Sequence, residues 1–388
     1  MLFYDIFQPG YRQASRDVLL VLGLVALSVV SFCAKPTGLK NPEIDLVKND
    51  TFLTACRQEK TPYTPVWLMR QAGRYMEEYR QLRARFAFLD LCKRPDLACE
   101  ITVTAVERLG VDAAILFSDI LLLLEPLGRG LAYTNGDGPV FHEPVRGGAD
   151  VDALREFDPA VALPFVYEAV RKSRAALNEK VPLIGFAGAP FTLASYLIEG
   201  RGSRQFAETK RFLYADPGTW RALMELLVRL IASYVNAQIR AGAHAIQIFD
   251  SWVGCLAPED YRANVLPHMR ALFSKLEPGI PVIHFTTGTS GMLELIRAAG
   301  GNVIGLDWRV DLDAAWERVG YDVGVQGNLD PLVLLAPQDE IRRQTREILQ
   351  RVSGRPGHIF NLGHGVLPET PVDNVIALVD AVHELSSR

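Results

Sequence analysis

The sequence has few cysteines and no excess of charge of either sign. Its 388 residues include only five cysteines, Cys33, Cys56, Cys92, Cys99 and Cys255. Their number is odd and they form no CxxC pair, which argues against a disulfide framework and predicts reduced, buried thiols in a cytoplasmic protein. The 41 basic and 45 acidic side chains give a net charge of −4. That balance excludes a generally basic surface that coats nucleic acid.

Several motifs that would identify a cofactor or a nucleophile are also missing. The glycine-rich stretch 185–203 has neither GxGxxG nor GxxxxGK[ST] spacing, which leaves phosphate binding without support. The absence of HExxH, of paired cysteines and of a GxSxG elbow argues against zinc hydrolysis and serine acyl transfer. We therefore expect neither a cofactor nor a bound metal.

One uncharged apolar run, VLLVLGLVALSVVSFCA (18–34), lies near the N-terminus. It is shorter than the roughly 20 residues that a spanning helix needs, although Arg12 and Arg16 precede it as in a secretory signal. If a signal sequence were cleaved after Ala34, a small residue would be expected at the position of Phe32, so Phe32 disfavours this cleavage. Two interpretations stay open: a misassigned upstream start, or a real hydrophobic extension that acts as an anchor. We therefore treat residues 1–46 as an extension and 47–388 as one domain.

The rest of the chain alternates short apolar runs with longer amphipathic segments. Its 49% hydrophobic and 22% charged residues exclude disorder and a multi-span membrane protein. Nearly continuous apolar runs are typical of strands covered on both faces, and strand–helix repetition predicts parallel crossovers. Eight such runs favour a single (β/α)8 TIM barrel. The runs are 65–69, 113–119, 183–188, 245–250, 281–286, 303–308, 322–328 and 358–363.

Most of these runs end in polar or glycine-bearing residues. In a barrel, the carboxyl ends of all strands meet on one face, and we expect the active-site cleft there. The stretch 121–150, with Asn135-Gly136 and Gly138-Pro139, predicts a hairpin over that face. The residues at the ends are Arg70 and Gln71, Ser118 and Asp119, Asp250 and Ser251, Thr286 and Thr287, Asp307, Gly327 and Asn328, and Gly363 and His364.

The densest chemical signal is MRQAGRYMEEYRQLRARF (69–86), which holds five arginines and no lysine. A guanidinium group is a planar fork that matches carboxylates and phosphates. Arg70 and Arg74 stand at a strand end, before the helical pattern begins, so we expect them to enter the cleft. We expect Arg80 and Arg85 to lie on a solvated helix face.

Three further side chains are candidates for the site. Asp119 ends an apolar run and is followed by more apolar residues, so its carboxylate is desolvated unless a donor or a cation meets it. His364 lies in NLGHG (361–365), where flanking glycines would let the backbone approach a ligand. Tyr196 lies on a helical turn above the cleft, after Pro190 breaks the preceding strand. Together these residues predict an enzyme for a polyanionic organic substrate, and spacing alone does not name the reaction.

Long motifs carry a resemblance to one family. PVWLMRQAGRYMEEYR (65–80), GFAGAPFTLASYLIEG (185–200), FSDI (117–120) and NLGHG (361–365) resemble signatures of the uroporphyrinogen decarboxylase family of the haem pathway. The similarity runs in order from about Val47 to the C-terminus, and residues 1–46 fall outside it. Met76 and Glu77 depart from the family's usual leucine and proline, at positions with no catalytic role.

The resemblance implies a cofactor-independent carboxy-lyase. It would convert the four acetate arms of uroporphyrinogen III to methyl groups, which gives coproporphyrinogen III and four molecules of carbon dioxide. Asp119 would receive the pyrrole N–H groups and stabilise positive charge on the ring. Arg70, Gln71 and Arg74 would hold carboxylates, and Tyr196, Ser251 and His364 would contact the side arms. The family also implies a homodimer.

Two other functions remain as alternatives. A corrinoid-dependent methyltransferase of the same fold would need a histidine–x–cysteine zinc motif, whereas this sequence reads His284-Phe285-Thr286 and its nearby Cys255 lies upstream. A non-catalytic tetrapyrrole-binding protein, tethered to a membrane through residues 18–34, is the second. The set of Asp119, Arg70 and Tyr196 argues against it.

Overall fold

A computed structural model describes residues 47–134 and 138–388 of the chain. The hydrophobic run 18–34 and the dipeptide Asn135-Gly136 therefore lie outside the described residues. The sequence features discussed below all belong to the unit that extends to Arg388 from Pro42.

A parallel sheet forms the centre of the fold. Its seven strands follow the order β1-β4-β5-β6-β7-β8-β9, so each strand pairs with the next one along the chain apart from the hairpin β2–β3. Parallel neighbours in sequential order, with a helical crossover between them, are the arrangement of an α/β barrel. The strands are β1 (Ala114–Ile115), β4 (Leu183–Gly188), β5 (Ala245–Asp250), β6 (Val282–Thr286), β7 (Val303–Gly305), β8 (Gly324–Gln326) and β9 (His358–Ile359).

The segment 65–69 occupies the eighth position and closes the ring. The N–H group of Phe360 donates to the carbonyl of Pro65 over 2.8 Å, and the N–H group of Asp112 donates to the carbonyl of Val66 over 2.8 Å. Hydrogen bonds on both sides thus join the end of the sheet beside β9 to the end beside β1. The predicted barrel is confirmed, with its eighth position held by a single parallel bridge between Val66 and Phe360.

The prediction that 65–69 is a regular strand was wrong. Side chains, rather than a neighbouring strand, accept from most of its N–H groups: the Asp112 carboxylate from Val66 (2.8 Å), the Gln71 amide from Leu68 (3.1 Å) and the Asn361 amide from Met69 (3.1 Å). With its donors engaged in this way, the segment cannot form a full ladder. Other predicted strands are shorter than expected because their last residues leave the sheet to form the loops of the site.

Proline and glycine mark many helix boundaries. Pro95 and Pro190 begin α5 and α9, where the missing N–H is not needed, and Gly110 and Gly200 end them with positive φ angles of 68° and 77°. The α-helices are α2 (Thr51–Cys56), α3 (Glu77–Arg85), α4 (Phe88–Lys93), α5 (Pro95–Leu109), α6 (Gly148–Ala153), α7 (Pro159–Ala162), α8 (Pro164–Leu177), α9 (Pro190–Glu199), α10 (Ala207–Ala215), α11 (Pro217–Arg240), α12 (Pro258–Asn264), α13 (Leu266–Ser274), α14 (Leu293–Ala299), α15 (Leu312–Val319), α16 (Gln338–Val352) and α17 (Val372–Ser386). The 3₁₀-helices are η1 (Leu122–Leu127), η2 (Val253–Cys255) and η3 (Pro331–Leu335).

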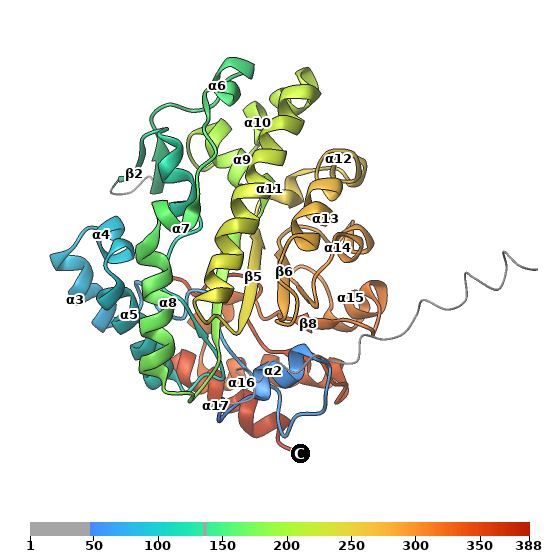
Figure 1. The fold of residues 1–388 in the computed structure, drawn as a ribbon. Coiled ribbons are helices and arrows are strands. Elements are labelled where there is room, and N and C mark those ends of the chain that lie inside the picture. The colour runs from blue at the N-terminus through green and yellow to red at the C-terminus, as the bar shows by residue number, and fades with distance from the viewer. Residues whose placement is uncertain (1–46, 135–137) are drawn as a thin grey trace, which may run out of the picture. The chain divides into compact units, whose positions relative to one another are not determined.

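The helices surround the strands on the outside (Figure 1). Helices α12 to α15 lie along one side of β5 to β8, and α5 and α8 lie on another. Among the described residues, α11 is the one helix long and apolar enough to cross a membrane by composition. Most of that helix is buried, with Trp220, Leu227 and Val235 all within the core, so its hydropathy is that of a core helix. The four described cysteines are free thiols, as predicted, but only Cys56 and Cys92 are buried, whereas Cys99 and Cys255 are half-buried.

The predicted hairpin is confirmed. Strands β2 (Leu131–Thr134) and β3 (Gly138–Phe141) pair in antiparallel register, with Leu131 opposite Phe141. The hairpin lies at the opposite end of the barrel from α2 and α17 (Figure 1). It therefore stands over the mouth of the barrel at the carboxyl ends of the strands.

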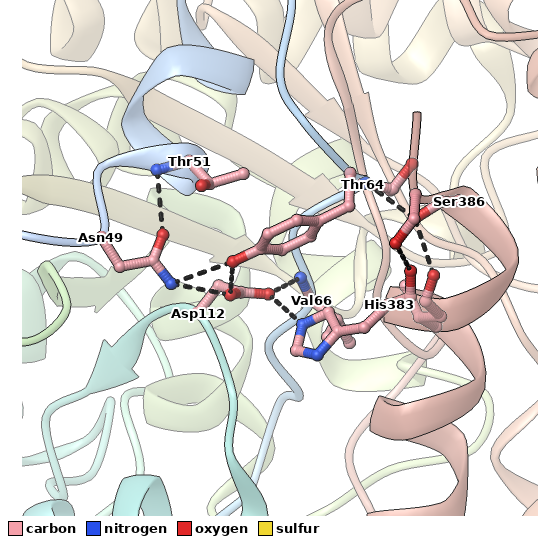
Figure 2. A network of polar contacts seen from close by, with 10 residues as sticks. Asn49, Thr51, Thr64, Val66, Asp112, His383 and Ser386 are labelled. Atoms are coloured by element: carbon pink, nitrogen blue, oxygen red, sulfur yellow. Dashed lines mark hydrogen bonds and ion pairs between the residues drawn. The ribbon is translucent and has the colours of Figure 1, made fainter.

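Asp112 ties the barrel closure together at the other end (Figure 2). Its buried carboxylate accepts from the amide of Asn49 (2.9 Å), the hydroxyl of Tyr63 (2.9 Å) and the N–H of Val66 (2.8 Å). Nε2 of His383, on α17, lies 2.8 Å from the same carboxylate. A buried anion with four partners is well compensated. One side chain thus joins the start of the domain, the closing segment and the last helix.

We expect Asp112→Ala to lower the free energy of unfolding by about 3–5 kcal/mol, because it leaves four buried or half-buried partners without their acceptor. Urea unfolding measures the change. Asp96→Ala is the matched control, since Asp96 is an exposed carboxylate whose pair with Lys172 lies at the surface, and such pairs contribute little. Equal stability losses in the two variants would contradict the role given to Asp112.

Candidate active site

A cavity of about 1110 Å³ opens at the carboxyl ends of the strands. Its wall combines the loop after the closing segment, the residues after β1, the ends of β4 to β6, the loop after β9 and the hairpin. The residues of that wall used below are Arg70, Arg74, Tyr79, Arg83, Arg85, Phe117, Asp119, Tyr133, Phe186, Phe249, Ser251, Phe285 and His364. The cavity lies where the barrel prediction placed the cleft, and it exceeds the usual volume of a drug-sized site.

Three phenylalanines from consecutive strands form an apolar part of this wall. Phe186 on β4 meets Phe249 on β5 with ring centroids 5.6 Å apart, and Phe249 meets Phe285 on β6 at 5.8 Å. Both pairs have the edge-to-face geometry that aromatic rings favour. The sequence reasoning missed these residues because a phenylalanine inside an apolar run reads as core. The available signal was an aromatic residue close to the end of three successive runs.

Four guanidinium groups line the cavity, from Arg70, Arg74, Arg83 and Arg85. Within residues 47–134 and 138–388, none of them has a carboxylate ion-pair partner within 4 Å. The cavity therefore carries positive charge that a bound anion can neutralise. Arg80 does not reach it and donates instead to the carbonyls of Arg74 and Tyr75. The expectation of a solvated face is thus correct for Arg80, whereas Arg85 is exposed and also lines the cavity.

Arg70 reaches the cavity from an unusual backbone conformation. Its φ angle is +62°, in the left-handed region that non-glycine residues seldom adopt and that costs about 1–3 kcal/mol. Its side-chain stem passes so close to Gly365 that a Cβ at position 365 would lie 2.4 Å from the Arg70 Cδ. A Cβ at position 363 would likewise lie 2.3 Å from the backbone nitrogen of Trp308. The glycines of NLGHG therefore make room for the protein's own chain, where the sequence analysis expected a ligand.

Asp119 is the carboxylate of the cavity wall. Its Oδ1 accepts from the N–H of Leu121 over 2.8 Å, and the side chain is half-buried. Burial raises the pKa of Asp119 above its usual value, and the Leu121 N–H, the Tyr133 hydroxyl and the Arg70 charge oppose that rise. Asp119 thus fixes its own turn and also faces the cavity.

His364 also lies on the wall, and it is a neutral group. Burial and the positive charges of Arg70 and Arg309 lower the pKa of His364 to about 4. Its Nδ1 accepts from the N–H of Gly365 over 2.8 Å, so in the neutral ring Nε2 carries the hydrogen. At neutral pH this side chain offers a hydrogen-bond donor without a charge.

The other predicted site residues are placed differently. Ser251 lines the cavity. Tyr196, on α9, stacks on Trp252 with ring centroids 3.7 Å apart, and it is not part of the cavity wall. Gln71 is fully buried beneath the wall, where its amide accepts from Leu68 and donates to the carbonyl of Ala113 over 3.1 Å. The structure therefore brings together Arg70, Arg74, Asp119, Ser251 and His364 and leaves Gln71 and Tyr196 outside the wall.

The described residues contain no group of three or more histidine, cysteine or acidic side chains that could hold a metal ion. His284 is fully buried, packs against Phe273 with ring centroids 5.2 Å apart and does not line the cavity. Thr286, two residues on, shares a hydrogen bond with Thr289. The place where a methyltransferase of this fold would hold zinc is thus occupied by a core histidine and a paired threonine.

A second buried carboxyl lies next to the site. Asp250 ends β5, and its Oδ1 accepts from the hydroxyl of Thr192 on α9 over 2.9 Å. Its Oδ2 has no hydrogen-bond partner among the described residues. Burial raises the pKa of Asp250 to about 7, and the Thr192 hydroxyl opposes that rise. Asp250 thus links the strand that leads to Ser251 with the helix that carries Tyr196.

Fold and cavity together define an α/β-barrel enzyme that binds a large polyanion in an arginine-rich mouth. Comparison with known proteins gives the particular family: a model described as uroporphyrinogen decarboxylase matches residues 47–385. The chain belongs to the uroporphyrinogen decarboxylase family.

Similar proteins agree with this assignment. The chain is 57% identical over 340 residues to the uroporphyrinogen decarboxylase of Carboxydothermus hydrogenoformans, an alignment that covers 87% of this chain and 97% of that protein. It is 55% identical over 338 residues to the enzyme of that name from Sorangium cellulosum, with 87% and 97% covered. Among solved structures, a methyltransferase from Methanosarcina mazei superposes with a TM-score of 0.71 at 21% identity, covering 87% of this chain and 98% of that one. At that identity the likeness shows the fold alone.

Asp250→Asn tests the buried carboxyl next to the site through stability. The folded protein keeps Asp250 protonated up to about pH 7, whereas the unfolded chain loses that proton near pH 4. The carboxyl therefore makes folding less favourable as pH rises from about 4 to 7, and the full penalty is present above 7. Asparagine does not titrate, so relative to the parent the variant should gain roughly 2–4 kcal/mol between pH 5 and pH 8.

Urea unfolding at pH 5 and pH 8 measures this change. In the control, Asp96→Asn, the carboxyl is exposed and its pKa is lowered by Lys172, so no gain at the higher pH is expected. The same variant-minus-parent difference at both pH values for Asp250→Asn would show that the carboxyl is already ionised in the folded protein.

Proposed function

We infer that this chain decarboxylates uroporphyrinogen III to coproporphyrinogen III, with release of four molecules of carbon dioxide, in tetrapyrrole biosynthesis. One observation carries the inference: four guanidinium groups without a carboxylate partner among the described residues line the same cavity as one carboxylate and an aromatic wall. Two relatives, at 57% and 55% identity, carry that enzyme's name, and the alignments cover 97% of each. The reaction belongs to the carboxy-lyases and needs no cofactor.

The arginines suit the acidic periphery of this substrate. Uroporphyrinogen carries four acetate and four propionate groups, and a protein of net charge −4 would repel such an anion without a local positive field. Arg70 and Arg74 grip carboxylates through their planar forks, and Arg83 and Arg85 extend the positive surface. The phenylalanine wall offers the pyrrole rings an apolar surface.

Asp119 supplies the electrostatic part of the reaction. Loss of carbon dioxide would leave a bare carbanion unless the ring accepts the electron pair. Protonation of a pyrrole α-carbon makes the ring iminium-like, so the ring accepts the electron pair of the breaking C–C bond as carbon dioxide leaves. The exocyclic methylene that results takes up a proton to become the methyl group, and the α-carbon releases the proton that it gained, which restores the pyrrole. A carboxylate that receives the pyrrole N–H groups stabilises the positive charge of this intermediate, an effect worth several kcal/mol in a water-poor site.

Among the described residues, neither the arginines, His364 nor Tyr196 is a suitable acid. Arginine, with a pKa above 12, is a poor proton donor. His364 is neutral because its pKa is lowered to about 4, and burial raises the pKa of Tyr196 far above neutrality. We therefore propose that a substrate carboxylic acid oriented by arginine, or a water molecule, supplies the proton.

The remaining site residues have supporting roles in this proposal. His364 donates Nε2–H to a side arm, and the Ser251 hydroxyl contacts another. Tyr196 packs its ring on Trp252, and the charges of Asp119 and Arg70 act on its hydroxyl, so in this proposal it supports the side of the site that holds these two residues. The Gln71 amide joins the backbone of Leu68, two residues before Arg70, to the carbonyl of Ala113 beside β1, so its contribution is to position Arg70.

The alternatives are not favoured. The M. mazei methyltransferase shares the fold, yet in this chain His284 and Thr286 lie in the core instead of the cavity. A purely tetrapyrrole-binding protein would not require a carboxylate placed among unpaired arginines. We also propose a cytoplasmic homodimer without a nucleic-acid partner, as the family resemblance implies, and analytical ultracentrifugation would measure the mass. Flotation of the full chain with lipid vesicles would test whether residues 18–34 add membrane association.

Asp119→Asn should abolish conversion of uroporphyrinogen while leaving the fold intact. The amide keeps the size and the turn but loses the negative charge, so we expect at least a 100-fold lower kcat, equivalent to about 2.7 kcal/mol. Anaerobic incubation followed by chromatography of the oxidised porphyrins measures it, and circular dichroism monitors the fold. Asp96→Asn, a surface change, should keep full activity. Undiminished coproporphyrinogen formation by Asp119→Asn would refute the role of Asp119.

Arg70→Lys tests the carboxylate grip. Lysine keeps the charge but loses the bidentate fork, so we expect KM to rise about tenfold. Like Arg70, the lysine would occupy a left-handed backbone position. If Arg70 also takes part in the chemical step, kcat falls and the pH–rate profile changes. A normal profile with only weakened binding would confine Arg70 to substrate binding. Arg80→Lys, outside the cavity, is the control and should leave KM unchanged.

A further inference from the structure

Tyr133 is a cavity residue that neither the sequence analysis nor the proposed chemistry uses. It lies on β2 of the hairpin, and its ring packs against Phe88 with centroids 4.8 Å apart. Its hydroxyl is buried and has no hydrogen-bond partner within the described ranges 47–134 and 138–388. A buried hydroxyl without a partner costs about 1–3 kcal/mol, and unlike the other tyrosine hydroxyls of this kind, that of Tyr133 belongs to a residue of the cavity wall.

Among charged groups, Asp119 acts most strongly on this hydroxyl. Burial raises the pKa of Tyr133, and the Asp119 carboxylate adds to that rise, so the phenol stays protonated and able to donate. In the opposite direction, the Tyr133 hydroxyl lowers the pKa of Asp119. Both residues line the same cavity, which Tyr133 reaches from β2 of the hairpin and Asp119 from the residues after β1. The Leu121 N–H occupies Oδ1 of Asp119, which leaves Oδ2 for the hydroxyl.

We propose that Tyr133 is a positioning residue for Asp119: its hydroxyl donates to the carboxylate when the macrocycle fills the cavity and holds it ionised toward the pyrrole nitrogens. This inference rests on the function proposed above. The hairpin then has a defined task, because it brings one hydroxyl from the insertion to the carboxylate that follows β1. The other groups that act electrostatically with Asp119 are Arg70 in the loop after the closing segment, Cys92 on α4, Tyr196 on α9 and Tyr234 on α11.

Tyr133→Phe removes the hydroxyl and keeps the ring. Loss of a donor to the charged form raises the pKa of Asp119, and the carboxylate must be ionised to receive the pyrrole N–H groups. The acid limb of the kcat/KM profile should therefore move up by about one pH unit. At neutral pH, kcat should fall about 3- to 10-fold with KM nearly unchanged, because the hydroxyl acts through Asp119 rather than on the side arms.

Tyr167→Phe is the matched control. Tyr167, on α8, also has a buried hydroxyl without a partner among the described residues, and its ring packs against Tyr234 at 6.0 Å. It does not line the cavity. This variant should retain the acid limb and the kcat of the parent. A stability effect common to both variants would appear equally in their thermal unfolding, whereas the pH profile isolates the effect on Asp119.

A second measurement does not depend on turnover. Carbon-13 NMR of protein labelled at aspartate carboxyls, with the Asp119 signal assigned by its loss in Asp119→Asn, follows the titration of Asp119 directly. A higher pKa of Asp119 in Tyr133→Phe supports the proposal, and an unchanged pKa together with an unchanged acid limb overturns it. A parent protein that does not convert uroporphyrinogen at all would instead overturn the proposed function, and the NMR titration would still decide the role of Tyr133.

Discussion

The site depends on how the closing segment of the barrel satisfies its backbone. Three side chains, Asp112, Gln71 and Asn361, accept from the N–H groups of Val66, Leu68 and Met69. Because buried N–H groups must be paired, these bonds fix the path of the chain through the eighth barrel position. Arg70 follows at once, in a left-handed conformation that the surrounding bonds maintain. The same contacts that close the barrel therefore aim the first arginine into its mouth.

The cavity carries positive charge because its arginines lack carboxylate partners among the described residues. Elsewhere on this chain arginines pair with carboxylates at the surface, as Arg342 does with Glu384 and Arg318 with Glu294. The cavity arginines have no such partner among the described residues, so the anion that neutralises them is the substrate. Burial raises the pKa of Asp119, and the Leu121 N–H, the Tyr133 hydroxyl and Arg70 oppose that rise. In the proposed reaction, this carboxylate meets the part of the substrate that becomes positive.

Neutral groups complete the site. His364 is kept uncharged by burial and by two neighbouring arginines, so it offers a hydrogen-bond donor without adding to the positive charge of the cavity. Asp250 is protonated around neutrality and joins β5 to α9 through Thr192. Tyr133 stays a phenol beside a carboxylate. With these groups neutral, Asp119 is the one carboxylate among the described residues of the wall.

The sequence by itself determined the class of fold, because strands buried on both faces leave nearly continuous apolar runs and barrel crossovers leave helices between them. It also located Arg70, Arg74, Asp119, Ser251 and His364 at strand ends, since such ends converge in any barrel. Only the tertiary structure decided that Gln71 lies beneath the wall, that the NLGHG glycines admit Arg70 and Trp308, and that Tyr133 reaches the site from the hairpin. These features depend on contacts between residues far apart in the sequence, and local patterns of hydropathy contain no information about such contacts.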